Sequence, residues 1–315
     1  MTLTELRYIV NLDKERHFGR AAERSFVSQP TLSVAVKKLE DELGVVLFER
    51  TRGEVKATDV GMRIVAQARR VLAEAQAVED LAREGKDELS GPLRLGAIYT
   101  VGPYLLPGLV PRLRALAPNM PLIIEENFTV KLLEQLRDSE LDVAILALPV
   151  DLNGLAAWPI YDEDFVAVLP QGHRWATLES LPPRRLAEEN LLLLGAGHCF
   201  RDQVIEACPK CIEPDSSHSR SLTGSSLETI RYMVASGLGI TVAPRAAMEG
   251  RDASPDLVGV DLAEPTPHRR VAILFRRGFP RMEALRVLRE AVLASGMRGV
   301  RWLPANTVVD EAGAG

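Results

Sequence analysis

Apolar residues recur at helical spacing in three short segments within the first sixty positions. Ser28 can cap the third segment, which has Pro30 in its first turn and ends at Gly44. Residues 48–56 follow, with the pattern of a hairpin that turns near Gly53. This order predicts an all-α N-terminal part that becomes a winged helix-turn-helix, in residues 1–58.

A second apolar pattern, in residues 59–90, has the alternating steps of four and three that mark a heptad repeat. Its positions are Ile64, Ala68, Val71, Ala75, Val78 and Ala82. They predict one long linker helix whose seam of small residues pairs with a second chain, which makes this the dimerisation helix. The alternative is a seam that is covered by the domain that follows.

From Pro92 onward, runs typical of strands alternate with runs typical of helices. We expect strands at residues 93–98, 122–126 and 143–148 in a mostly parallel sheet, with helices at 104–116 and 130–137. The chain then enters a second lobe near Asp162, returns near His268 and closes with a helix at 281–294. This predicts an α/β regulatory domain that resembles a periplasmic binding protein, in residues 91–302. Lobe I would be 91–161 plus 268–302, lobe II 162–267, and 303–315 a disordered tail.

Composition narrows the class of protein. No apolar run reaches 18 residues and the start has no signal-sequence pattern, so we expect a cytoplasmic protein with no membrane partner. Three cysteines in 315 residues do not make a disulfide framework. The net charge of -5 argues against nonspecific coating of nucleic acid but allows a local basic face.

The third predicted helix carries the candidate DNA contacts, because this helix of a helix-turn-helix enters the major groove with its N-terminal part. Near its start, Gln29, Thr31 and Ser33 could reach base edges beside Pro30. The candidate phosphate contacts are Lys37, Lys38, Arg50 and Arg52. The alternative is a three-helix module that binds only protein.

Cys199 and Cys208 are nine positions apart. In a helix they would stand about 13 Å apart along the axis, whereas a disulfide needs Cα atoms within about 7 Å. A bond between them would therefore require the segment to refold. The alternative for each cysteine is an ordinary small buried side chain. Cys211 completes a C-x-x-C sequence with Cys208, but no second pair matches it, so we expect neither a metal site nor a cofactor.

Two threonines follow predicted strands, Thr100 after the first and Thr129 after the second. Because the carboxyl ends of parallel strands meet at one edge of a sheet, both hydroxyls could face one crevice. Ordinary turn or helix-cap threonines are the alternative.

Several motifs resemble the LysR-type transcriptional regulators, over nearly the whole chain except its tail. The motifs of the DNA-binding domain are FGRAAE at 18–23, VSQPTLS at 27–33 and KLEDELG at 38–44. Three further motifs resemble the peroxide-sensing branch of this family: TVGPYL at 100–105, GHCFRDQ at 197–203 and SLET at 226–229. Two features depart from the pattern of that branch: the bulky Phe200 beside the thiol, and Cys211.

The resemblance implies a redox mechanism. Cys199 would attack peroxide as a thiolate, become a sulfenic acid and be captured by Cys208, with Cys211 as a competing candidate. Thr100 and Thr129 would hold peroxide. His198 and Asp202 would support it or move protons, and either Arg269 or Arg270 would stabilise the thiolate.

The resemblance also implies partners. It predicts a regulator rather than an enzyme, a homotetramer built as a dimer of dimers, that activates antioxidant genes through promoter DNA and RNA polymerase. Hydrogen peroxide would be the signal, and a thiol reductant such as glutaredoxin or thioredoxin would reset it. Two alternatives remain: a LysR-type regulator that binds a metabolite, and a thiol peroxidase.

Overall fold

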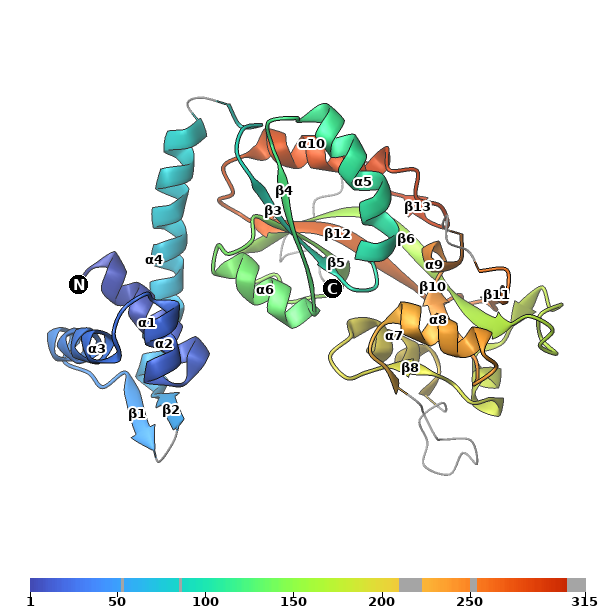
Figure 1. The fold of residues 1–315 in the computed structure, drawn as a ribbon, viewed down its shortest axis with the longest axis horizontal. Coiled ribbons are helices and arrows are strands. Elements are labelled where there is room, and N and C mark those ends of the chain that lie inside the picture. The colour runs from blue at the N-terminus through green and yellow to red at the C-terminus, as the bar shows by residue number, and fades with distance from the viewer. Residues whose placement is uncertain (52–53, 85–86, 210–222, 250–253, 305–315) are drawn as a thin grey trace. The chain divides into compact units, whose positions relative to one another are not determined.

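The computed structural model describes residues 1–51, 54–84, 87–209, 223–249 and 254–304, and the chain divides into two compact units (Figure 1). The N-terminal unit consists of Met1–Lys86 with the short segment Arg137–Ser139, and the C-terminal unit of Asp87–Leu136 and Glu140–Gly315. Cys211 and Arg52 lie outside the described residues, as does the tail from residue 305. No helix in the described ranges is long and apolar enough to cross a membrane.

The N-terminal unit is the expected winged helix-turn-helix. Its elements are α1 (Leu3–Glu15), α2 (Phe18–Arg24), α3 (Gln29–Leu43), β1 (Phe48–Thr51) and β2 (Glu54–Ala57). Ser28 caps α3, because its side chain accepts a hydrogen bond from the backbone N–H of Thr31 at 3.3 Å. Gly44 ends α3 in the left-handed conformation, with φ of 68°. Both predicted ends of this helix are confirmed.

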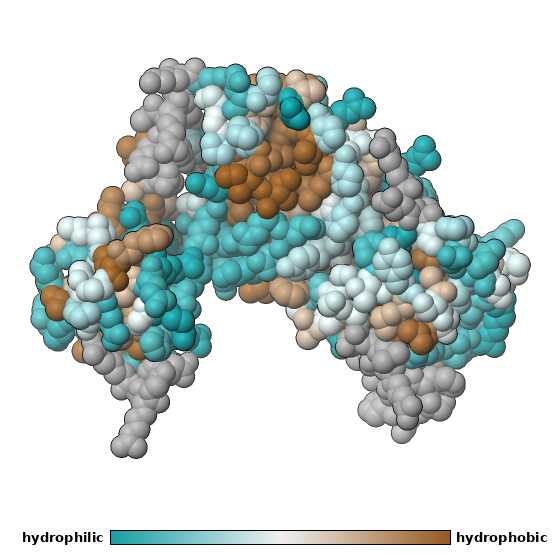
Figure 2. Space-filling model, in the orientation of Figure 1, coloured by the Kyte–Doolittle hydropathy of each residue, from teal (hydrophilic) through white to brown (hydrophobic). Residues whose placement is uncertain are grey.

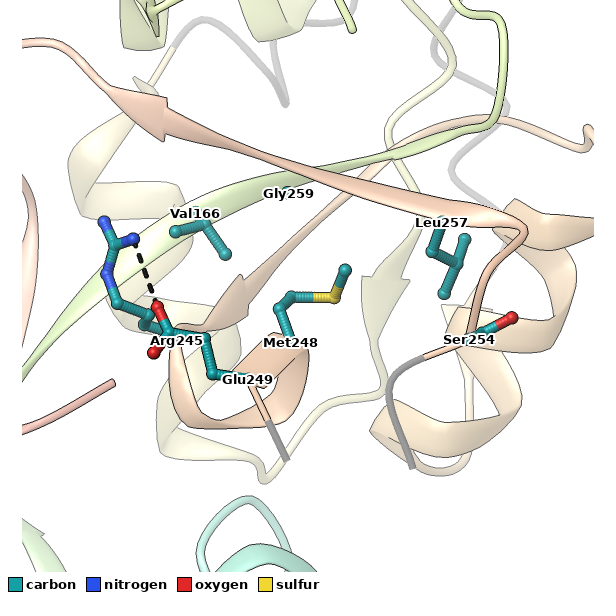
Figure 3. A pocket seen from close by; sticks show the side chains of 7 residues that line it. All are labelled: Val166, Arg245, Met248, Glu249, Ser254, Leu257 and Gly259. Carbon is teal, nitrogen blue, oxygen red and sulfur yellow. Dashed lines mark ion pairs between the residues drawn. The ribbon is translucent and has the colours of Figure 1, made fainter. Parts of the chain in front are cut away.

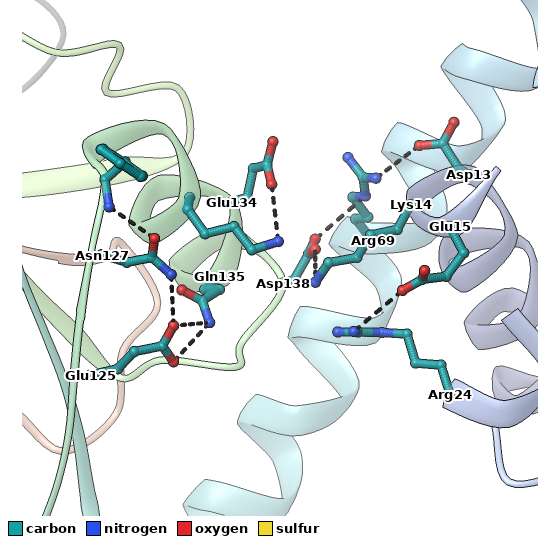
Figure 4. A network of polar contacts seen from close by, with 12 residues as sticks. Asp13, Lys14, Glu15, Arg24, Arg69, Glu125, Asn127, Glu134, Gln135 and Asp138 are labelled. Carbon is teal, nitrogen blue, oxygen red and sulfur yellow. Dashed lines mark hydrogen bonds and ion pairs between the residues drawn. The ribbon is translucent and has the colours of Figure 1, made fainter. Parts of the chain in front are cut away.

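The long helix α4 (Asp59–Glu84) is capped by the preceding Thr58, whose hydroxyl accepts from the backbone N–H of Gly61 at 2.9 Å. Ala68, one of the predicted seam positions, is buried in the core of its own unit. Arg69 donates to Asp13 of α1 at 2.9 Å (Figure 4). Val71 and Val78, further along the seam, are exposed in the single chain. The N-terminal unit thus covers the first part of the seam and leaves later positions open.

Lobe I of the C-terminal unit has the predicted alternation of strands and helices. Its first elements are β3 (Leu93–Ile98), α5 (Gly102–Leu116), β4 (Leu122–Asn127), α6 (Thr129–Arg137) and β5 (Val143–Leu148). Strand β3 pairs in parallel with β4 and with β5. The next strand in the sheet, β12 (His268–Arg276), is antiparallel to β5 and to β6 (Leu155–Pro170). The parallel part of the sheet is therefore smaller than we expected, since it ends at β5.

Strand β6 and the returning strand β12 carry the chain between the lobes (Figure 1). The two lobes have separate apolar cores: Tyr161 of β6 belongs to the core of lobe I and Phe165 to that of lobe II. Lobe I closes with α10 (Met282–Leu293) and β13 (Arg301–Trp302). The elements of lobe II are β7 (Ser180–Leu181), the 3-10 helix Pro183–Glu188, β8 (Leu193–Leu194), α7 (Cys199–Ala207), β9 (Thr223–Gly224), α8 (Leu227–Ala235), β10 (Thr241–Pro244), α9 (Ala246–Glu249) and β11 (Leu257–Leu262).

Candidate functional site

Helix α7 separates the two cysteines of interest. Cys199 is its first residue and Cys208 its C-cap, where the backbone N–H of Cys208 donates to the carbonyl of Val204 at 3.0 Å. Cys199 is a free, half-buried thiol. Cys208 is 2% exposed and takes part in a disulfide, which does not include Cys199. The helix holds the two residues about 13 Å apart along its axis, so a bond between them requires α7 to unwind.

A small pocket lies beside Cys199, with about 10 Å³ of free volume. That is close to the volume that holds one water molecule. Thr100 and Thr129, predicted to share a crevice, both line it. The full lining is Ile98, Tyr99, Thr100, Asn127, Phe128, Thr129, Gly197, His198, Cys199 and Phe200. Strand ends of lobe I and the first turn of α7 therefore meet at one site.

Arg269 is fully buried between the lobes and joins several groups of the site. Its guanidinium donates to the hydroxyl and the carbonyl of Thr100, both at 2.8 Å. It also donates twice to one carboxylate oxygen of Glu163, at 2.9 and 2.8 Å. Burial alone would lower the pKa of Arg269, but the nearby charges, chiefly Glu163 and also Cys199, hold that pKa above its ordinary value. A permanent positive charge thus lies close enough to Cys199 to stabilise negative charge there.

Phe200 anchors the first turn of α7. Its ring is 1% exposed, packs edge-to-face on Phe165 at 4.9 Å and lies under the Arg269 guanidinium, 5.3 Å from the ring centre. The bulky side chain that departs from the family pattern therefore points into the core of lobe II. It excludes water from one face of Arg269.

Thr129 differs from Thr100 in its hydrogen bonding. Its hydroxyl is buried and has no hydrogen-bond partner among the described residues. A buried hydroxyl without a partner is costly, so it is an available donor for a small molecule in the pocket.

His198 forms an aromatic wall of the pocket with two other rings. It meets Phe128 edge-to-face at 4.8 Å and Tyr99 at 5.8 Å. Burial lowers the pKa of His198, while a hydrogen bond to the backbone of Ser225 opposes this change. The ring is therefore uncharged at neutral pH. Gly197 permits this packing, because its φ is +97° and an added Cβ would lie 3.3 Å from the Phe128 ring.

Asp202 and Arg270, like Cys208, do not line the pocket. Asp202 lies on the exposed side of the first turn of α7. Arg270 points to the opposite face of β12 from Arg269 and pairs with Asp162 at 2.7 Å, with its side chain 45% exposed. Of the two adjacent arginines, Arg269 is the one beside the thiol.

Residues that the sequence did not reveal support the pocket lining through hydrogen bonds. Gln135 donates to both carboxylate oxygens of Glu125 at 2.9 Å, and Asn127 donates to the same carboxylate at 3.0 Å (Figure 4). Asn127 in turn accepts from the backbone N–H of Phe128 at 2.9 Å. Glu163, the partner of Arg269, is a second such residue. The register of β6 with β12 places it opposite Arg269, which sequence alone does not give.

A larger hollow in lobe II has different chemistry. It has about 200 Å³ of free volume and is lined by Val166, Arg245, Met248, Glu249, Ser254, Leu257 and Gly259 (Figure 3). Arg245 is its cation, and two acidic side chains already pair with it: Glu249 at 3.6 Å and Asp261 at 2.8 Å. None of these described lining residues carries a thiol. Within the described ranges, no group of three metal-ligating side chains occurs.

The candidate DNA contacts lie on one helix and the wing. Gln29, Pro30 and Thr31 are exposed in the first turn of α3, and Ser33 is partly exposed. Lys37 and Lys38 are exposed on the same helix and pair with Asp41 at 2.9 Å and Glu5 at 3.3 Å. Arg50 belongs to β1, and Arg52 lies outside the described residues.

Comparisons with known proteins agree over most of the chain. Residues 3–62 match the bacterial regulatory helix-turn-helix family of lysR type, and residues 86–296 match the LysR substrate binding domain. The chain is 40% identical over 294 residues to the DNA-binding transcriptional dual regulator OxyR of Escherichia coli K12, covering 93% of this chain and 95% of that protein.

Solved structures give the same result. Full-length OxyR from Pseudomonas aeruginosa, with a cysteine replaced by aspartate, is 51% identical, has a TM-score of 0.75 and covers 96% of this chain and 98% of its own. A hydrogen peroxide-bound cysteine-to-serine variant of Corynebacterium glutamicum OxyR is 33% identical, has a TM-score of 0.60 and covers 93% of this chain and 94% of its own. This chain therefore belongs to the OxyR group of the LysR-type transcriptional regulators.

Proposed function

We propose that this chain is a transcriptional regulator that senses hydrogen peroxide through Cys199. One observation carries the proposal: a free thiol begins α7 in a pocket of about 10 Å³, beside the fully buried cation of Arg269. The relatives named hydrogen peroxide-inducible genes activators and the peroxide-bound relative support the same signal.

The chemistry of the first step follows from the groups around the thiol. The Cys199 thiolate attacks one oxygen of hydrogen peroxide and the O–O bond breaks, which leaves a sulfenic acid and a hydroxide that takes up a proton to become water. The Thr129 hydroxyl is available to donate to the peroxide. Thr100 accepts from Arg269 and can still donate its own proton. The uncharged ring of His198 forms one wall of the pocket and can accept or pass on a proton.

The second step joins the two cysteines. The Cys208 thiol attacks the sulfenic sulfur of Cys199, which forms a disulfide and releases water. Cys208 must be a thiol for this step, so the disulfide in which it takes part has to be reduced first. A thiol reductant such as glutaredoxin or thioredoxin would do this and would also reset the oxidised sensor. Such cycling needs a reducing compartment, so we propose a cytoplasmic protein.

The size of the pocket distinguishes this function from metabolite sensing. Pockets for small organic ligands have volumes of about 300–1,000 Å³, far above the 10 Å³ beside Cys199. A peroxide molecule needs only a small displacement of the lining, whereas a metabolite would need the site rebuilt. A thiol peroxidase is the other alternative, but a DNA-binding unit has no use in such an enzyme.

The output is a change in promoter binding and in access for RNA polymerase. Exposed apolar surface supports assembly as a dimer of dimers. Figure 2 shows an apolar area over α5 and β4, and the exposed large side chains of these elements are Leu116, Ile123 and Ile124. Strand β4 is also the edge of its sheet, a position that natural proteins usually cover. We therefore propose that a second copy of the chain covers this area.

A cysteine variant tests the function. We expect Cys199→Ser to abolish peroxide-induced transcription while promoter binding by the reduced protein is unchanged, since the N-terminal unit is untouched. Transcription from an antioxidant promoter and electrophoretic mobility of the same promoter DNA measure the two effects. Steady-state peroxide consumption by the purified wild-type protein, independent of DNA, would favour the peroxidase, and a peroxide response that survives in Cys199→Ser contradicts the proposal.

A further inference from the structure

The first turns of α3 are polar on their outward face except at Val34. Val34 is 68% exposed, the most exposed large apolar side chain of this helix. It lies three residues after Thr31 and three before Lys37, so the three side chains share one face. Both of these neighbours are exposed polar residues.

The fold of the N-terminal unit does not account for a valine there. The residues of α3 that pack into the core are Leu32, Val36 and Leu39, with exposures of 0%, 3% and 0%. A β-branched residue lowers helix stability slightly and an exposed one gains little in return. Val34 is therefore an apolar group held at the centre of the surface that the proposed function presents to the major groove.

We propose that Val34 reads a thymine, by packing against its C5-methyl group in the major groove. That methyl is the one apolar group that the four base pairs display in this groove. The polar and basic residues around Val34 suit the phosphates and base edges on either side of it. Val34 would thus be a specificity-determining residue, and the inference rests on the proposed function only in requiring that α3 bind DNA.

Uracil in place of thymine tests the contact, because it removes the methyl and leaves every hydrogen bond of the base pair intact. The duplex is one selected from random-sequence DNA by the full-length protein, and each thymine is replaced in turn. We expect one position per half-site at which the replacement weakens wild-type binding about fourfold, as expected for one buried methyl. At that position the variant Val34→Ala should bind the two duplexes equally.

A matched control separates this effect from a general loss of exposed apolar surface. Val46 is 58% exposed and follows the C-terminal end of α3, away from its first turns. Val46→Ala should keep the wild-type response to uracil. Alanine is a better helix former than valine, so Val34→Ala is expected to fold.

Two outcomes distinguish a failure of the thymine contact from a failure of the proposed function. If every uracil replacement affects wild type and Val34→Ala equally, the thymine contact is wrong while DNA binding stands. If the wild-type protein selects no sequence at all, the proposed function fails and the inference fails with it.

Discussion

The two cysteines at the ends of α7 lie in opposite surroundings, although nine positions separate them. Cys199 is half-buried, packs against the core of lobe I and lines a pocket with polar groups. Cys208 is buried in the apolar core of lobe II. A small oxidant can reach the first sulfur, and negative charge on it has a cation nearby. The second has neither advantage, so we expect oxidation to begin at Cys199 and to reach Cys208 only through a change of shape.

The residues between the cysteines explain why that change is large. Phe200 and Val204 of α7 are buried in the core of lobe II together with Cys208. Unwinding α7 exposes such side chains, and each contributes about 1.5–3 kcal/mol when buried. The energy of the new disulfide must offset this loss, so the oxidised protein cannot keep the same lobe II core.

The largest expected effect is at the Cys208 end. After full reduction and a pulse of peroxide, we expect Cys208→Ser to lose the disulfide to Cys199 completely, and Cys211→Ser to retain it. Peptide mapping by mass spectrometry measures the links. A dominant bond between Cys199 and Cys211 in the wild type would reverse our choice of the second cysteine and with it the comparison between the two ends of α7.

The next largest effect separates the two adjacent arginines. Arg269→Met leaves the carboxylate of Glu163, 1% exposed, without its charged partner and with one hydrogen bond from the backbone N–H of Ala246, so we expect a loss of about 3–5 kcal/mol in unfolding free energy. The matched control is Arg270→Met. It removes a pair in which the arginine side chain is 45% exposed and the Asp162 side chain 13% exposed, so it should cost less than Arg269→Met. Urea unfolding of the two variants gives the difference, and equal losses would show that burial does not distinguish these pairs.

A third variant separates the rate of Cys199 oxidation from the stability of the fold. The Thr129 hydroxyl has no partner among the described residues, so Thr129→Val should leave the unfolding free energy nearly unchanged. It removes one donor to the reacting peroxide, and we expect Cys199 oxidation to slow about 100-fold. Thr100→Val is the control, because it also loses the bond from Arg269 and should lower both rate and stability. The rate of thiol loss at fixed peroxide concentration is the measurement, and a wild-type rate in Thr129→Val removes Thr129 from the site.

Local signals explain what the sequence predicted well. The caps of α3 depend on Ser28 and Gly44 themselves, and short-range chemistry of this kind is visible in a sequence. Thr100 and Thr129 were expected to share a crevice because the ends of parallel strands share an edge of the sheet, whereas the resemblance to the peroxide-sensing branch alone placed Cys199 beside them.

The features that the sequence could not predict depend on the pairing register of strands that are far apart in the chain. Which of Arg269 and Arg270 faces the thiol depends on the side of β12 that turns inward, and on its pairing with β6 across more than 100 positions. The partner Glu163 depends on the same pairing. Asp202 belongs to the recognisable motif, yet its position on α7 turns it to solvent.

The smallest expected effect concerns the protonation of His198. It tests how far water is excluded from the surroundings of Cys199. Because burial lowers its pKa, the unfolded chain binds a proton to this ring at pH values where the folded protein does not. The unfolding free energy should therefore decrease, and the folded state lose stability, as pH falls below about 6.5 towards the folded-state pKa. His198→Phe keeps an aromatic ring against Phe128 and should remove this part of the pH dependence. Urea unfolding of both proteins between pH 7.5 and 5.5 measures it, and identical slopes would mean that water reaches His198 as freely as it reaches the unfolded chain.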